Sequence, residues 1–190
     1  MKELALLLII FMMGIIIVNK SNENKDLKSE ISQIDGKSYF VRKLPDSQQA
    51  ADTLCKLTQD LKLLVNKVEV SDKEGCGQLK TNFDPDNIVE NVPESKYTSY
   101  SLNKGEKLAI CLRHKPTEEF MDYNIIMFVC LHELAHVMTD EVGHTDKFWD
   151  NMKFLLEKSE EYKIYQPVDY SKKPEMYCGM EINSSPYDFK

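Results

Sequence analysis

Apolar residues recur at three- and four-residue intervals in two parts of the chain, which is the spacing of one face of an α-helix. The first stripe follows Pro45-Asp46 and predicts a helix that packs on a core; its members are Leu54, Leu57, Leu61, Leu64 and Val68. The second stripe predicts a helix that ends at about residue 159; its members are Phe148, Met152, Leu155 and Leu156. The first helix carries no visible chemistry and is interpreted as a support.

Short strands are predicted where β-branched and aromatic residues gather between turn residues. Residues 38–44 suit a first strand, and residues 97–102 and 107–113 suit a hairpin joined by the turn Asn103-Lys104-Gly105-Glu106. Residues 71–96 hold two glycines and two prolines among polar residues, so this part is predicted to be mostly loop. The tail from Tyr162 onward is predicted to be irregular.

Two further stretches are apolar on every side. Residues 120–138 predict a helix that is packed on several sides. Residues 4–18 are an unbroken run of apolar residues and glycine between Lys2 and Lys20. As a helix this run would span ~22 Å, short of the ~30 Å hydrocarbon core of a bilayer. No small-residue cleavage site follows it, so a membrane anchor is favoured over a cleaved signal peptide.

The chain is therefore divided into a membrane anchor at residues 1–20, a polar tether at 21–37 and one globular domain at 38–190. A length of 190 residues with 42% hydrophobic content supports one modest domain. The positive-inside rule favours the cytoplasmic side for this domain, because one lysine precedes the apolar run and several follow it. Those that follow are Lys20, Lys25, Lys28 and Lys37.

Side chains that can bind a metal ion or transfer a proton are concentrated at residues 132–136, which read His-Glu-Leu-Ala-His inside the apolar helix. Residues four apart lie on the same face of a helix, so His132 and His136 can bind one metal ion. Glu133 lies one residue round from that face, where its carboxylate can reach a metal-bound water. Burying these polar groups without a metal or partners would be costly. The spacing indicates a hydrolytic zinc site.

His144 is the predicted third ligand, provided that the helix ends before it. Eight further helical residues beyond His136 would carry it ~12 Å along the axis, too far to share an ion. Gly143 can take positive φ and reverse the chain, and Thr145-Asp146 offers an N-cap for the next helix. Three protein ligands with a fourth position open to water are the arrangement of a catalytic zinc site.

These residues resemble a known group of enzymes. His132-Glu133-Leu134-Ala135-His136, followed by Gly143-His144-Thr145-Asp146-Lys147-Phe148-Trp149, is similar to the WLM and YgjP-like minimal zincin metallopeptidases, relatives of the SprT and Spartan type. Those families commonly place five residues between the second and third histidines, and seven stand here, which leaves the subfamily and substrate open. The resemblance covers roughly residues 97–180. Tyr177-Cys178-Gly179-Met180 is similar to forms of the domain from large DNA viruses.

The resemblance implies an α+β, zincin-like minimal metallopeptidase domain, built from a small mixed sheet, a support helix, the metal helix and a closing helix. The apolar run at residues 4–18 adds an N-terminal transmembrane helix before this domain. It implies one zinc ion per chain, held by His132, His136 and His144. Glu133 is then the general base that activates water to hydrolyse a peptide bond. In zincins the strand before the metal helix, here residues 108–113, often forms the sheet edge where an extended peptide docks; an ordinary sheet strand is the alternative.

Net charge narrows the partners that we expect. The chain carries a net charge of −7, and its only adjacent basic pairs are Arg42-Lys43 and Lys172-Lys173. This pattern gives no phosphate-binding footprint, so nucleic acid is not an expected partner, although Spartan-type relatives act on proteins crosslinked to DNA. A peptide or protein substrate and the membrane are expected. The alternative is a membrane-tethered structural or virion assembly protein with little protease activity. Glu133 favours the enzyme, because a structural zinc site needs no water-activating carboxylate.

The remaining cysteines and aromatic residues are expected to serve the fold. Five cysteines without metal-type spacing are interpreted as buried free thiols, with Cys111 in an apolar strand and Cys130 in the apolar helix. Three tyrosines of the tail are candidates for stabilising an oxyanion, with packing as the preferred interpretation: Tyr165, Tyr170 and Tyr177. His114 is expected in a surface loop.

Overall fold

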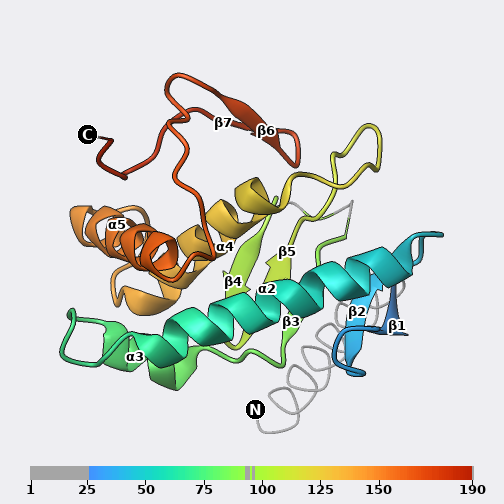
Figure 1. Cartoon of the computed structure of the whole chain (residues 1–190), viewed down its shortest axis with the longest axis horizontal. Helices are drawn as coiled ribbons and strands as arrows, with labels where there is room; N and C mark the ends of the chain where they lie inside the picture. The colour runs from blue at the N-terminus through green and yellow to red at the C-terminus, as the bar shows by residue number, and fades with distance from the viewer. Residues whose placement is uncertain (1–25, 93–94, 96, 190) are drawn as a thin grey trace, which may run out of the picture.

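A 21-residue helix, α2 (Ser47–Lys67), crosses the front of the molecule in Figure 1 and packs on two strands, β2 (Ser38–Arg42) and β3 (Ile88–Glu90). The computed structural model describes residues 26–92, 95 and 97–189. The other elements are β1 (Leu27–Ile31), α3 (Cys76–Asn82), β4 (Tyr100–Leu102), β5 (Lys107–Ile110), α4 (Tyr123–Met138), α5 (Asp146–Glu161), β6 (Glu175–Tyr177) and β7 (Met180–Ile182). The predicted α+β class is confirmed.

The central sheet is small and mixed, as expected, with the strand order β3-β5-β4. Strand β3 pairs with β5 in parallel, and β4 pairs with β5 antiparallel across the predicted turn at residues 103–106. The prediction that residues 108–113 lie at the sheet edge is wrong, because β5 is paired on both sides. The edge strand that contacts the metal helix α4 is β4.

Close packing explains the glycine of this turn. Asn103 and Lys104 have φ of 47° and 54°, and Gly105 has φ of 115°. A Cβ atom on Gly105 would lie 2.6 Å from the backbone oxygen of Asn82 and 2.9 Å from Cγ1 of Val137. The turn therefore lies directly against the C-terminal end of α4, and only glycine allows that approach.

The hydrophobic stripe of α2 is confirmed as a core-facing surface. Leu54, Leu57, Leu61, Leu64 and Val68 are all fully buried. Helix α4 is buried almost all round, as its sequence predicts, and it packs between α5, α3 and strands β4 to β6. His132 and His136 lie at the few positions where this helix reaches the surface, whereas Glu133 is buried.

Three loop-like segments hold more regular structure than the sequence indicates. The predicted tether at 21–37 is wrong over Leu27–Ile31, because this segment forms β1 and pairs antiparallel with β2. Residues 71–96 contain α3 and β3, and the tail contains the hairpin β6–β7. Each of these elements is only three to seven residues long, too short for the local periodicity of apolar residues to reveal it.

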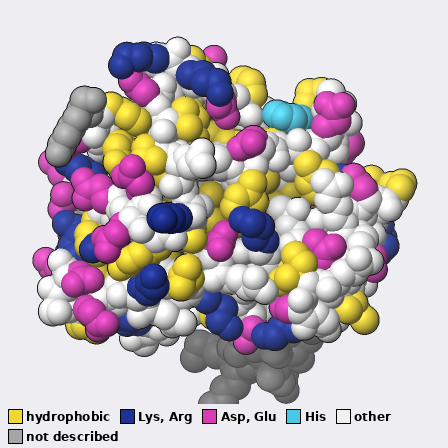
Figure 2. All heavy atoms as spheres, in the orientation of Figure 1, with side chains coloured by type: hydrophobic (Ala, Val, Ile, Leu, Met, Phe, Trp, Pro, Cys, Tyr) yellow, Lys and Arg dark blue, Asp and Glu magenta, His cyan; other side chains and the backbone are white. Residues whose placement is uncertain are grey.

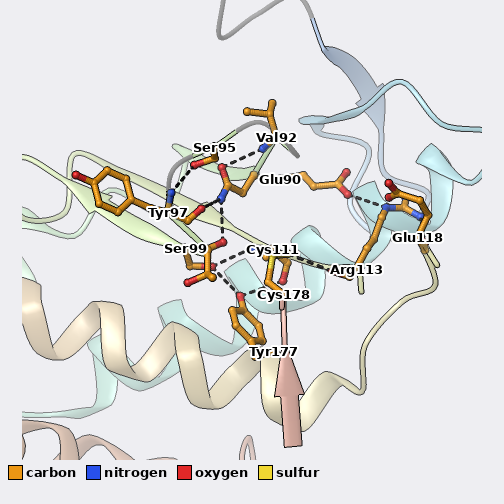
Figure 3. The surroundings of a disulfide bond; sticks show 12 residues. Glu90, Val92, Ser95, Tyr97, Ser99, Cys111, Arg113, Glu118, Tyr177 and Cys178 are labelled. Atoms are coloured by element: carbon orange, nitrogen blue, oxygen red, sulfur yellow. Dashed lines mark hydrogen bonds and ion pairs between the residues drawn. A yellow bond between two sulfur atoms is a disulfide. The ribbon is translucent and has the colours of Figure 1, made fainter. Parts of the chain in front are cut away.

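A disulfide joins Cys111, just after β5, to Cys178 in the β6–β7 turn (Figure 3). This corrects the expectation of a free thiol at Cys111. The two residues are 67 positions apart with a Cα–Cα distance of 6.2 Å, a separation for which spacing gives no signal. Cys55, Cys76 and Cys130 are free and buried, as expected.

The membrane prediction concerns residues 4–18, which lie outside the described residues. Across residues 26–92, 95 and 97–189, no helix has the length and apolar character needed to cross a bilayer.

On the face seen in Figure 2, acidic and basic side chains are interspersed over the surface. That face shows no field of a single sign.

Candidate metal centre

Helix α4 carries two of the predicted ligands on one face. It begins after Asp122, whose carboxylate accepts a hydrogen bond of 2.8 Å from the backbone N–H of Asn124. It ends at Met138, because Thr139 leaves the helical conformation with φ of −102° and ψ of 126°. The helix therefore stops two residues beyond His136, as the third-ligand prediction requires.

The following loop brings His144 back to the helix. Gly143 has φ of 91°, the positive value predicted for the reversal. Thr145 caps α5, since its hydroxyl accepts a hydrogen bond of 3.3 Å from the backbone N–H of Phe148. His144 thus stands between a glycine reversal and a helix start, and both features direct the chain back toward α4.

The three imidazoles point their Nε2 atoms at one another. The Nε2 atom of His144 lies 3.1 Å from that of His132 and 3.2 Å from that of His136. Two nitrogens bound to one tetrahedral zinc at ~2.0–2.1 Å lie about 3.3 Å apart, so the observed spacing fits a zinc ion. All three predicted ligands form one cluster, and the clustered atoms lie within 4.8 Å of one another.

Two aromatic residues of α5 surround this cluster. The buried ring of Phe148 lies 4.4–4.9 Å from the three imidazole centroids. Trp149 is 40% exposed and lies 5.5 Å from the ring of His144 and 6.3 Å from that of His132. The Phe-Trp pair of the sequence motif therefore packs against the ligands and restricts their rotation.

Burial sets the protonation of the two histidines on α4. It lowers the pKa of His132 to about 3, and the neighbouring His136 and His144 add to this effect. It lowers the pKa of His136 to about 4, with contributions from His144 and Lys104. These two imidazoles are therefore neutral at pH 7, which is the form that binds a metal ion.

Glu133 is buried at the same end of α4, with 7% of its surface exposed. Burial raises the pKa of Glu133 to about 7, and a backbone hydrogen bond from Ser101 opposes that rise. Ser101 belongs to the edge strand β4. The carboxylate that sequence spacing places one residue round from the ligand face thus lies between that face and the edge of the sheet.

The tyrosines of the tail serve packing. Tyr165, Tyr170 and Tyr177 are all buried, and the ring of Tyr170 lies edge-on to Phe128 at 4.8 Å. The hydroxyl of Tyr177 donates to the backbone oxygen of Cys111 at 3.0 Å and lies 2.7 Å from the Ser99 hydroxyl (Figure 3). The preferred interpretation is confirmed for Tyr177, whose hydroxyl is engaged by the sheet. His114 is in the loop after β5, outside the cluster.

Sequence reasoning missed the residues that support the loop between the ligands. Lys104 donates to the backbone oxygens of Thr139 and Glu141, and the side chain of Asn151 donates to the Thr139 hydroxyl at 2.9 Å. These contacts join parts of the chain that are far apart in sequence. The sequence predicted the hairpin turn that contains Lys104, but it did not predict the hydrogen bonds of the Lys104 side chain.

Comparison with known proteins identifies a matching family and viral relatives of this chain. Residues 33–186 match the family described as the WLM domain. The uncharacterized protein R325 of Acanthamoeba polyphaga mimivirus is 36% identical over 171 residues, which cover 84% of this chain and 86% of R325. The uncharacterized protein 136R of Invertebrate iridescent virus 6 is 30% identical over 122 residues, which cover 63% of this chain and 68% of 136R.

The fold is also similar to that of a solved structure, Wss1 from Saccharomyces cerevisiae. The TM-score is 0.52 with 21% sequence identity, and the similarity covers 65% of this chain and 87% of the Wss1 chain. At this level of identity the likeness concerns the fold.

Proposed function

The chain belongs to the WLM domain family, and from this membership and the geometry of its histidine cluster we propose that it is a membrane-anchored zinc metallopeptidase that hydrolyses peptide bonds. WLM proteins form a family of zinc metallopeptidases, and the related proteins R325 and 136R come from large DNA viruses. Protein or peptide substrates follow from that class. Residues 4–18 are the proposed anchor.

The observation that carries the proposal is the convergence of three Nε2 atoms, with a buried glutamate next to the first ligand in the same helix. His132, His136 and His144 supply three nitrogen ligands, which is one fewer than a tetrahedral zinc ion takes. A purely structural site is usually closed by four protein ligands. Across the described residues, no fourth histidine, cysteine or carboxylate joins this cluster, which favours catalysis over a structural role.

Zinc bound there would lower the pKa of a water molecule and polarise the scissile carbonyl. In this proposal Glu133 takes a proton from that water and hands it to the leaving amine. Burial suits the carboxylate to both tasks, because a raised pKa makes it a stronger proton acceptor than an exposed glutamate. Phe148 packs against the imidazoles and excludes water from their inner side.

Nucleic acid is not part of the proposal. Carboxylates engage basic residues of both adjacent pairs: Glu118 pairs with Arg42, Asp169 with Lys172 and Glu175 with Lys173. With a net charge of −7, the chain offers little attraction for a phosphate backbone. A protease that requires DNA would instead show DNA-stimulated cleavage that falls with salt.

The test uses the purified full chain with a peptide library and mass spectrometry of the products. We expect cleavage that a zinc chelator abolishes and that added zinc restores. Tight zinc binding with no cleavage of any peptide would overturn the proposal and favour a membrane-tethered structural or assembly protein. Cleavage that survives complete zinc removal would overturn the metal mechanism.

A further inference from the structure

We propose that Lys104 is a positioning residue of the metal centre, which fixes the loop that carries His144 and thereby sets the affinity for zinc. The inference rests on the proposed zinc site. Lys104 lies in the β4–β5 turn, far in sequence from the three histidines, and it touches none of them through a hydrogen bond that the structure records. Its positioning effect is exerted through the main chain of the loop and is separate from the effect of its charge on His136.

The contacts of Lys104 are with the two carbonyl groups where α4 ends and the loop begins. Its Nζ atom donates to the Thr139 oxygen at 2.5 Å and to the Glu141 oxygen at 3.0 Å. The last carbonyls of a helix lack partners within the helix, and a cation there also interacts favourably with the helix dipole. One ammonium group thus joins the end of the metal helix to the first residues of the ligand loop.

The turn that presents Lys104 is held rigidly against α4. Lys104 itself has φ of 54°, and Gly105 beside it approaches the backbone of Asn82 and the side chain of Val137 too closely to accept a Cβ atom. The turn is also joined to the segment after α3, because the backbone N–H of Asp84 donates to the Gly105 oxygen at 3.1 Å, and Gln78 of α3 donates to the Val137 oxygen of α4 at 2.8 Å. The backbone of Lys104 is therefore held in place against α4, and the hydrogen bonds of its side chain restrain the loop.

The rest of the loop needs such an anchor. His144 is the one ligand that is not on α4. The two residues that precede His144 lie at the surface: Val142, which is 91% exposed, and Gly143. An unanchored loop would have to be ordered when the ion binds, and the entropic cost of that ordering would reduce the affinity. Residues that orient metal ligands typically change affinity by about 10- to 100-fold when they are replaced.

The experiment measures the zinc dissociation constant of the full chain by competition with a chelator of known affinity. Lys104→Met keeps the length of the side chain and removes its donors, and Lys104→Arg keeps a cationic donor. Lys80→Met is the matched control, because Lys80 also donates to a carbonyl at a helix end, that of Asn66 at 3.1 Å, away from the histidines. Melting temperatures in excess chelator report the stability of each zinc-free protein.

We expect Lys104→Met to raise the dissociation constant about 10- to 100-fold, Lys104→Arg to recover part of the loss, and Lys80→Met to bind as the wild type does. Equal affinity in the wild type and Lys104→Met would overturn the inference and leave the proposed function intact. The inference would also be overturned if Lys80→Met weakened zinc binding as much as Lys104→Met does. It would be overturned too if the rise in the dissociation constant of Lys104→Met were explained by a lower melting temperature of its zinc-free form, because Lys104 would then serve only the fold. A wild type that binds no zinc would overturn both.

Discussion

The Nε2 atoms of His132 and His144 lie 3.1 Å apart, although twelve positions separate the two residues and only His132 belongs to α4. The helix end at Met138 and the positive φ of Gly143 bring about this meeting. The position of the third ligand therefore depends on the conformation of the loop between Met138 and His144.

Replacement of His144 by alanine should remove most of the bound zinc. The wild-type chain is expected to hold one zinc ion, and two imidazoles alone are a weaker site than three. Metal analysis after gel filtration in zinc-free buffer measures the content. Full retention by the variant would exclude His144 as a ligand and point to Asp140 or Glu141, the nearest carboxylates in the same loop; Asp140 is 3.0 Å from Lys147 in an ion pair.

The variant Glu133→Gln should lose activity while it keeps its zinc. The amide has the size of the carboxylate and leaves the three histidines in place, but it cannot accept the proton of water. General-base catalysis contributes ~10²–10⁴-fold to the rate, so kcat should fall by about that factor. Zinc content and melting temperature should match the wild type, with the exposed Glu119→Gln as a control for the loss of one charge. Unchanged cleavage would refute the role of Glu133.

Removal of the Cys111–Cys178 bond should destabilise the domain. The bond closes a loop between residues 67 positions apart, and a native disulfide typically contributes about 2–4 kcal/mol. Urea unfolding of the double variant Cys111→Ser/Cys178→Ser should show this loss. A reductant should lower the stability of the wild type and leave that of the double variant unchanged. If reductant affects both proteins equally, the effect has another cause.

The ion pair of Glu90 and Arg113 should be costly to break. The Arg113 Nε atom lies 2.8 Å from a Glu90 oxygen, and each side chain is only 1% exposed. Breaking a buried pair leaves a charge without compensation and typically costs about 3–5 kcal/mol. We expect Glu90→Gln to fall at the lower end, because Asp46 still pairs with Arg113. Chemical unfolding measures the change, and Lys37→Gln, which breaks an exposed pair with Asp86, should change stability little.

The full chain should remain in the membrane fraction after alkaline carbonate extraction. A run of apolar residues at positions 4–18 favours an integral anchor, and deletion of residues 1–20 should release the protein. A mature chain that begins near Ser21 would instead identify a cleaved signal peptide.

The side of the membrane can be read from the same preparation. The lysines after residue 18 favour a cytoplasmic domain, whereas a structural disulfide is typical of oxidising compartments. Asn183 lies in the sequon Asn183-Ser184-Ser185 and is exposed. A glycan on Asn183 would place the domain on the lumenal side, and protease sensitivity of the domain in intact cytosol-facing vesicles would place it on the cytoplasmic side.

The sequence by itself determined the parts of this protein that depend on local geometry. A helix repeats every 3.6 residues whatever surrounds it, so the stripe of α2 and the shared face of His132 and His136 could be predicted from spacing. Gly143 and Thr145 act on their own backbone and their immediate neighbours, and both perform as expected. The position of Glu133 follows from the same helical repeat.

Only the tertiary structure decided which distant segments meet. Strand β5 lies inside the sheet because β3 and β4 pair on its two sides, and Cys178 meets Cys111 because the β6–β7 hairpin docks there. Lys104 reaches the end of α4 across a turn that is fixed by packing against Val137. Such contacts follow from the burial of the whole core, and no periodicity in the chain encodes them. The histidine spacing determines the chemistry, and long-range packing determines how firmly the site is held.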